Sequence, residues 1–71
     1  MPFVNIRIVK EVIAEDPAGK KQAIAAAVQA AITGTTGIGA DDIWVVFEEV
    51  AAGDWYVGQN SVEALKARTS S

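Results

Sequence analysis

The fold is decided by the segment IWVVFEE, residues 43–49, which has the strongest β-strand pattern in the chain. Successive side chains of a strand point to opposite faces. One face of this segment carries Ile43, Val45 and Phe47. The other face carries Trp44, Val46 and Glu48. The segment therefore predicts a strand that has one wholly apolar face.

A second strand is predicted near the start of the chain, where residues 3–9 read FVNIRIV. Its apolar face carries Val4, Ile6 and Ile8. The opposite face carries Phe3, Asn5, Arg7 and Val9. The many β-branched residues also favour a strand. One of the two faces is thus committed to a core.

A helix is predicted between the two strands, after a connecting segment, residues 11–15, of open structure. Asp16 is suited to cap its first amides, and Pro17 is suited to its first position. An apolar stripe follows at helical spacing, made of Ile24, Ala27, Val28, Ala31 and Ile32. The polar positions are Lys20, Lys21, Gln22 and Gln29, with both lysines expected on the outer surface. Gly34 is expected to end the helix.

Strand, helix and strand in this order predict a β-α-β unit whose two strands are parallel. The segment DWYVGQ, residues 54–59, predicts a small hairpin or an arm that reaches a neighbouring subunit. Asn60 and Glu63 resemble a capping box that opens a short helix through Ala67, followed by a frayed tail at residues 69–71. The predicted fold class is α/β (α+β), in a single domain over residues 1–71.

The composition excludes several kinds of function. The chain has 71 residues, a formal net charge of −3, no cysteine and no histidine. Disulfides and Cys–His or Ser–His–Asp catalysis are therefore excluded, and a structural zinc site nearly so. Six scattered lysine and arginine residues make nucleic acid a poor partner. No apolar run approaches a membrane span of roughly 20 residues, and residues 1–7 lack a signal-peptide layout, so we expect a cytoplasmic protein without membrane contact.

Two observations predict self-association. A chain of this length buries only roughly 60% of its unfolded surface, which leaves a lone core marginal. A two-stranded sheet covered by one helix also leaves one face bare, and here that face carries Phe3, Val9, Trp44 and Val46. We therefore expect a homo-oligomer (a dimer, trimer or hexamer). Trp44 is expected to anchor the interface in preference to contacting substrate.

Pro2 is the candidate catalytic group. The Met-Pro start favours removal of Met1, which would leave Pro2 with a free secondary amine leading into the first strand. Apolar surroundings disfavour the charged form of an amine and lower its pKa toward the range where a general base works best. The proline ring also fixes the direction of the nitrogen. The alternative is that proline at position 2 reflects methionine removal alone.

The pattern around Pro2 resembles the 4-oxalocrotonate tautomerase family over essentially the whole chain. The similar segments are PFVNIRI at residues 2–8, the helix at residues 20–32, IWVVFEEV at residues 43–50 and GDWYVG at residues 53–58. The resemblance implies a cofactor-free isomerase that acts on a small-molecule substrate, with Pro2 as the general base. It places the family's aromatic pocket residue at Trp55 or Tyr56. It also implies assembly, commonly as a hexamer, with active sites shared between subunits.

The chain departs from this family at two cationic positions. The arginine that binds a substrate carboxylate after the first strand is absent from residues 12–15, and the arginine that polarises the substrate carbonyl corresponds to Trp44. Burying a carboxylate without a cation is costly. Either Arg7, Lys10 or Arg68 replaces these arginines, or the substrate is less charged. Arg7 is otherwise expected to form an ion pair at an interface.

Two other functions remain open at the level of sequence. The first is a non-catalytic oligomeric binding module that kept the fold and lost the chemistry, which the missing arginines favour. The second is a related reaction of the same superfamily, such as hydration, dehalogenation or decarboxylation. The mass of the purified chain separates the first from the enzyme, because catalysis by Pro2 requires the loss of Met1.

Overall fold

The computed structural model of the chain describes residues 1–69, and the side chains of residues 1–67. The described elements, in chain order, are β1 (Phe3–Val9), the 3-10 helix η1 (Lys10–Ile13), α1 (Pro17–Thr36), the 3-10 helix η2 (Ala40–Asp42), β2 (Trp44–Val50), the 3-10 helix η3 (Ala52–Asp54), β3 (Tyr56–Val57), β4 (Asn60–Ser61) and α2 (Val62–Thr69).

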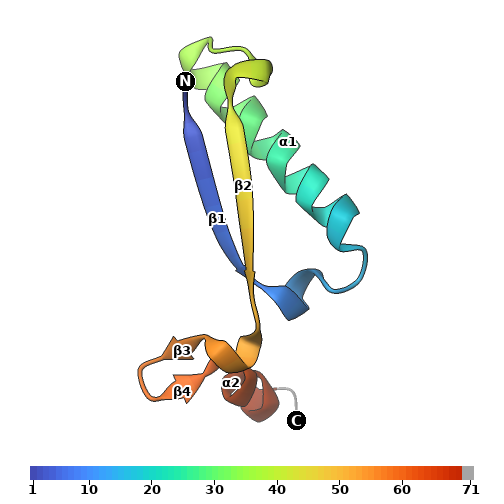
Figure 1. The fold of residues 1–71 in the computed structure, drawn as a ribbon, viewed down its shortest axis with the longest axis vertical. Helices are drawn as coiled ribbons and strands as arrows, with labels where there is room; N and C mark the ends of the chain where they lie inside the picture. The colour runs from blue at the N-terminus through green and yellow to red at the C-terminus, as the bar shows by residue number, and fades with distance from the viewer. Residues whose placement is uncertain (70–71) are drawn as a thin grey trace.

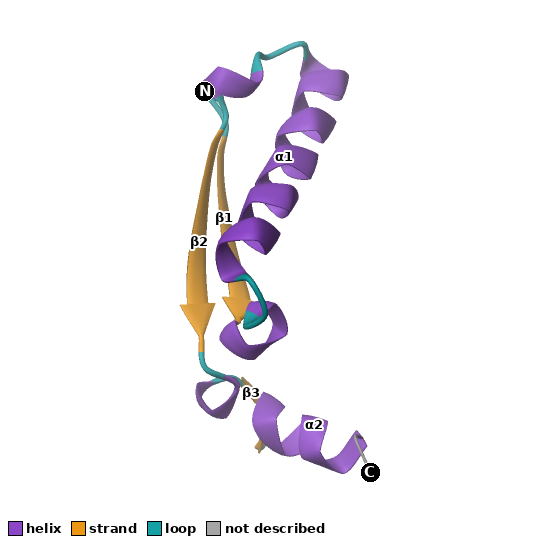
Figure 2. Ribbon diagram, turned by 90° about the vertical axis from the view of Figure 1, so that its right-hand side faces the viewer, coloured by secondary structure: helices purple, strands orange, loops and turns teal. Residues whose placement is uncertain are grey.

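The two long strands form the predicted parallel pair. Their register runs from Phe3 opposite Trp44 to Val9 opposite Val50. The chain crosses from β1 to β2 through α1, which lies along one side of the strands (Figures 1 and 2). The strand predicted at residues 43–49 is shifted by one position, because Ile43 is buried ahead of β2 and not paired in its ladder. The β-α-β prediction is confirmed.

The start of α1 is as predicted and its end is not. Asp16 Oδ1 accepts a hydrogen bond from the Gly19 N–H at 3.1 Å, which caps the helix. The predicted stop at Gly34 is wrong, because the helix continues to Thr36 and ends at Gly37. Gly37 has φ of 80°, the left-handed conformation that glycine adopts most readily, and its N–H donates to the Thr33 carbonyl at 2.8 Å. The left-handed backbone at Gly37 therefore ends α1.

The face that α1 turns toward the strands also differs from the predicted stripe. Ile24, Val28 and Ile32 are half-buried as expected, but Ala27 and Ala31 are exposed. One lysine expected on the outer surface, and one residue expected only as a polar position, contact β2 or the residue just before it. Lys21 Nζ lies 2.7 Å from Glu49 Oε2 (salt bridge), and Gln29 Nε2 donates to the Ile43 carbonyl at 3.1 Å. The side of α1 that faces the strands therefore combines the predicted apolar residues with two polar ones.

The C-terminal segment contains the predicted hairpin and helix. Tyr56 pairs with Ser61 and Val57 with Asn60, in antiparallel register. The predicted cap at Asn60 is wrong by one residue, because Asn60 lies in β4 and the Ser61 Oγ accepts from the Ala64 N–H at 3.1 Å. The helix α2 then extends to Thr69, beyond the predicted end. The tail at residues 70–71 lies outside the described residues.

One chain alone is extended and has little core. Its radius of gyration is 15.1 Å, compared with about 11 Å for a compact chain of this length. Its accessible surface is 4991 Å², compared with about 4,200 Å² for a folded monomer of this mass. Only Ile13, Ile43 and Ala52 are fully buried among the described apolar side chains. The chain therefore exposes surface that a self-sufficient monomer would cover.

The side of the strands opposite α1 accounts for much of this exposure, and we call it the open face. Its residues are Phe3, Asn5, Arg7 and Val9 of β1 and Trp44, Val46, Glu48 and Val50 of β2. Phe3 is 62% exposed, Trp44 55% and Val46 40%. Within residues 1–69 no element covers this face (Figure 1). None of the described helices combines the length and the apolarity needed to cross a membrane.

Glu11 joins the end of β1 to the C-terminal segment. Its Oε1 accepts a hydrogen bond from the N–H of Ala52 at 2.9 Å, at the start of η3. That N–H would otherwise have no partner within the short helix. The bond from Ala52, followed by the Glu11 backbone and the charges of Lys10 and Lys66, lowers the pKa of the Glu11 carboxyl. Glu11 thus helps to hold η3, and the residues that follow it, against the end of β1.

We expect Glu11 to make stability depend on pH. Its pKa is lower in the folded state than in the unfolded state, so the unfolded chain binds more protons at acidic pH. The stabilisation is complete above the unfolded pKa of about 4.3 and is lost as pH falls through the lower, folded pKa. Glu11→Gln should therefore unfold at lower urea than wild type at neutral pH, with a difference that shrinks as the pH falls below the unfolded pKa of Glu11. Glu15→Gln, which removes the same charge from an exposed loop, is the control; equal pH curves for E11Q and wild type would refute this role.

Candidate active site

Pro2 lies at the N-terminal end of the β1–β2 ladder. Its carbonyl accepts a hydrogen bond from the N–H of Trp44 at 3.0 Å, which fixes it to the start of β2. Pro2 is half-buried, and the exposed rings of Phe3 and Trp44 occupy the adjacent pair of the ladder. Trp44, predicted both as an interface anchor and as a substrate contact, is thus next to Pro2. Two aromatic residues therefore follow Pro2 in the ladder, and both belong to the open face.

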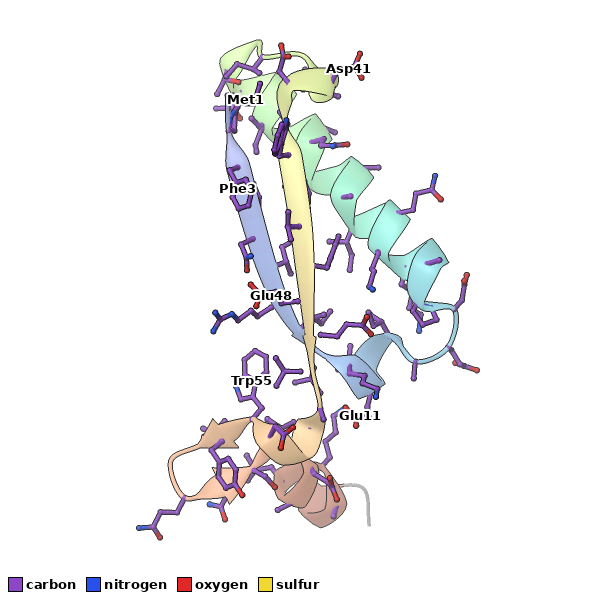
Figure 3. The ribbon with its side chains drawn as sticks, viewed as in Figure 1. Met1, Phe3, Glu11, Asp41, Glu48 and Trp55 are labelled. Carbon is purple, nitrogen blue, oxygen red and sulfur yellow. The ribbon has the colours of Figure 1, made fainter. Side chains whose placement is uncertain are left out.

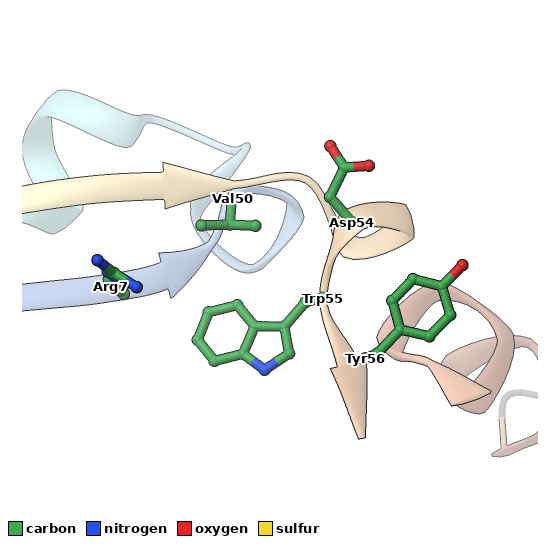
Figure 4. A pocket seen from close by; sticks show the side chains of 5 residues that line it. All are labelled: Arg7, Val50, Asp54, Trp55 and Tyr56. Carbon is green, nitrogen blue, oxygen red and sulfur yellow. The ribbon is translucent and has the colours of Figure 1, made fainter. Parts of the chain in front are cut away.

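The other end of the ladder carries a hollow, of about 220 Å³. Its lining residues are Arg7, Val50, Asp54, Trp55 and Tyr56 (Figure 4). The first two come from the open face of β1 and β2, and the last three come from the segment that follows β2. Three predicted substrate-binding residues, Arg7, Trp55 and Tyr56, are therefore brought together from distant parts of the sequence.

The position of Trp55 is fixed by hydrogen bonds of both its backbone N–H and its backbone carbonyl. Its N–H donates to the Ala52 carbonyl at 3.4 Å, and its carbonyl accepts from the Val62 N–H at 2.7 Å. Trp55 is thus held between η3 and the first residue of α2. Its indole faces the hollow beside Arg7 and Val50, whereas the Tyr56 ring points to the other side of the backbone (Figure 4). Of the two predicted aromatic pocket residues, Trp55 is the one directed toward Arg7.

The charges around the hollow are sparse. Arg7 Nε lies 3.7 Å from Glu48 Oε2, a long contact between two exposed side chains. Glu48 is also held by Asn5, whose Nδ2 donates to Glu48 Oε1 at 2.8 Å. Asp54 supplies one carboxylate to the lining, and Figure 4 shows that it points away from the indole. Arg7 is the sole cationic residue among the described lining residues.

The remaining predicted cations lie elsewhere. Lys10 is exposed in η1 and does not line the hollow, and the side chain of Arg68 lies outside the described residues. Val50 and Asp54 line the hollow although the sequence analysis did not single them out. Val50 has the same strand parity as Trp44 and Val46, and Asp54 immediately precedes Trp55. Extending the strand alternation by one pair would have found Val50, and Asp54 is already the first residue of the predicted segment 54–59.

Within one chain, Pro2 and the hollow lie at opposite ends of the β1–β2 strand pair. Figure 3 shows Met1 and Phe3 at one end of the strands and Trp55 beyond the other. Along β1 the Cα atoms of Pro2 and Arg7 are roughly 16 Å apart at the usual rise per strand residue. A small substrate cannot touch both within one chain. The candidate active site is therefore present here as two separate parts.

The sequence and the fold were compared with known proteins. The chain matches the family described as tautomerase enzyme over residues 2–65. A chain of the 4-oxalocrotonate tautomerase isozymes from Methylibium petroleiphilum superposes with a TM-score of 0.76 and 23% identity, covering 90% of this chain and 97% of that one. DmpI from Helicobacter pylori superposes with a TM-score of 0.77 and 25% identity, covering 93% of this chain and 97% of that one. No curated protein matches the sequence. Because the family match begins at Pro2 and spans most of the chain, this protein belongs to the tautomerase family.

Proposed function

We propose that the chain is a cofactor-free tautomerase that converts the enol form of a 2-oxo acid to its keto form, with Pro2 as the general base. The observation that carries this proposal is the position of Pro2. It is the first residue of the family match, it is half-buried, and its carbonyl is held at the start of β2 by the Trp44 N–H. Once Met1 is removed, its ring nitrogen is a secondary amine, and burial against apolar side chains of a second copy would favour its neutral form.

The proposed reaction needs only one proton carrier. The neutral Pro2 nitrogen takes the proton from the enol hydroxyl, and the oxygen electron pair forms the carbonyl. The electrons of the carbon–carbon double bond then take the same proton back from the Pro2 ammonium, which forms the new C–H bond. The amine is regenerated and no oxidant, reductant or metal enters the balance. General acid–base catalysis of this kind is worth roughly 10²- to 10⁴-fold in rate.

We further propose that the working protein is a homo-oligomer, with a hexamer as the favoured state, in which Pro2 of one copy meets the hollow of another. Three features support this. The open face exposes Phe3, Trp44 and Val46. The chain is more extended than a self-sufficient monomer of its length. Pro2 and Trp55, which the proposed reaction needs together, lie at opposite ends of the strands (Figure 3).

The test of the proposed function is the mass of the purified chain together with its activity. We expect intact mass spectrometry to give a chain one methionine lighter than the 71-residue sequence. That protein should convert phenylenolpyruvate to its keto form, followed by ultraviolet absorbance. A version with extra residues retained before Pro2, so that its nitrogen stays in a peptide bond, should lose essentially all of this activity. Full activity of the extended version would overturn the proposal.

The competing function is a non-catalytic binding module with the same fold. One observation favours it: no cationic side chain adjoins Pro2 among the described residues, and Trp44 lies where a carbonyl-polarising arginine is expected. A mature chain that retains Met1, with no activity on phenylenolpyruvate, would favour this alternative over the enzyme.

A further inference from the structure

We propose that Arg7 and Trp55 form a subsite for a single carboxylate carried on a small apolar body, and that this subsite selects monocarboxylates over dicarboxylates. The binding step stands on the geometry of the hollow alone. Its use in catalysis rests on the proposed function, because the subsite would then hold the substrate that Pro2 of another copy acts on.

The guanidinium of Arg7 is available to an anion. Among the side chains of residues 1–67 its one ion pair is the 3.7 Å contact between Nε and Glu48 Oε2, and it donates no hydrogen bond. Glu48 has a shorter partner in Asn5, at 2.8 Å. An exposed ion pair of this length contributes little to stability. A ligand carboxylate that receives two parallel N–H bonds from the guanidinium would bind Arg7 better than Glu48 does.

The wall beside Arg7 is apolar. The indole of Trp55 and the methyl groups of Val50 border the same hollow as Arg7, and Figure 4 shows the indole lying beside Val50 on the side of Arg7. The volume of about 220 Å³ lies below the roughly 300 to 1,000 Å³ of drug-sized sites. It therefore fits a small molecule. An aromatic or alkyl group would pack on the indole while its carboxylate reaches the guanidinium.

The charge balance limits the ligand to one carboxylate. Arg7 is the sole cation of the described lining, and Asp54 and Glu48 place two carboxylates near the rim. Lys21 is held by Glu49 at 2.7 Å, on the face of the strands opposite Arg7. A second ligand carboxylate would find no cation here and would face like charge. A dicarboxylate, such as the enol of 4-oxalocrotonate, should thus bind less well than a monocarboxylate of the same size.

The experiment measures binding of three inert ligands that share a phenyl group and differ in charge. They are 3-phenylpropanamide (neutral), 3-phenylpropanoate (one carboxylate) and phenylsuccinate (two carboxylates). The two indole N–H signals of the chain, from Trp44 and Trp55, report the site of binding by NMR. We expect the monocarboxylate to bind tightest and to move the Trp55 signal. Arg7→Gln should weaken its binding about 10- to 100-fold, down to the level of the amide.

Two matched variants control for net charge. Lys20→Gln removes the same positive charge from an exposed position of α1 and should leave all three affinities unchanged. Asp54→Asn removes a rim carboxylate and should strengthen binding of phenylsuccinate more than binding of the amide. The inference fails if the amide binds as well as the acid, if phenylsuccinate binds tightest, or if R7Q and K20Q behave alike.

The binding assay also separates this inference from the proposed function. The version with extra residues before Pro2 should still bind 3-phenylpropanoate in the hollow of its own chain. If it binds while the mature protein is inactive, the subsite stands and the tautomerase proposal falls. If the mature protein is active but R7Q leaves KM for phenylenolpyruvate unchanged, the tautomerase stands and the use of the subsite in catalysis is refuted.

Discussion

Replacing Pro2 with alanine is expected to lower kcat for the ketonisation of phenylenolpyruvate by roughly 10²-fold or more, with little change in KM. Alanine at position 2 still allows Met1 to be removed, so the variant keeps an amine at the same place. That amine is primary and rotates freely, whereas the proline ring holds its nitrogen in one direction. The lost rate should therefore come from orientation and basicity and not from substrate binding.

Two readouts show whether the effect of Pro2→Ala is chemical. The rate of the wild type should rise with pH as the amine loses its proton, and this rise should move to a different pH in the variant. Pro17→Ala is the matched control, because it replaces the other proline of the chain, at the first position of α1, with the same residue. It should keep the wild-type rate. A Pro2→Ala enzyme with the wild-type rate and pH profile would exclude Pro2 as the base.

The elements of the fold could be predicted because each has a strong local signal. Alternating side chains placed β1 without error and β2 within one residue. The Asp16–Pro17 pair placed the start of α1, since a cap and an N1 proline act over one turn. The same alternation also predicted the exposed side of the strands, because one helix can cover only one face of a two-stranded sheet.

The errors arose where a choice depends on contacts between distant residues. Gly34 and Gly37 are equally plausible helix ends in sequence, and only the backbone conformation at Gly37 distinguishes them. Lys21 was expected to be solvated, but Glu49, 28 positions later, draws it toward the strands. The hollow also depends on a distant contact. Arg7 and Trp55 are far apart in sequence and come together only when β1 and β2 are paired. Local pattern carries no information on such pairs.

Val46→Glu is expected to break the assembly and, with it, the activity. Val46 lies in the middle of the open face, opposite Asn5 in the ladder, and is 40% exposed in one chain. If a second copy covers this face, the new carboxylate is buried without a partner, at a cost of several kcal/mol (roughly 3 to 5 per unpaired charge). The change lies away from both Pro2 and the hollow. Any loss of rate would therefore come from assembly.

The measurement is sedimentation velocity together with kcat/KM for phenylenolpyruvate. We expect wild type to sediment as an oligomer, and V46E to sediment as a smaller species with at least tenfold lower kcat/KM at low protein concentration, because Pro2 and Trp55 of one chain cannot reach the same substrate. Val46→Thr is the control, since threonine keeps the β-branched shape and strand preference without a charge, and it should retain the oligomer. Activity of V46E that recovers as protein concentration rises would tie the loss to assembly directly. If V46E is monomeric and fully active, one chain contains a complete site and the shared-site proposal is wrong.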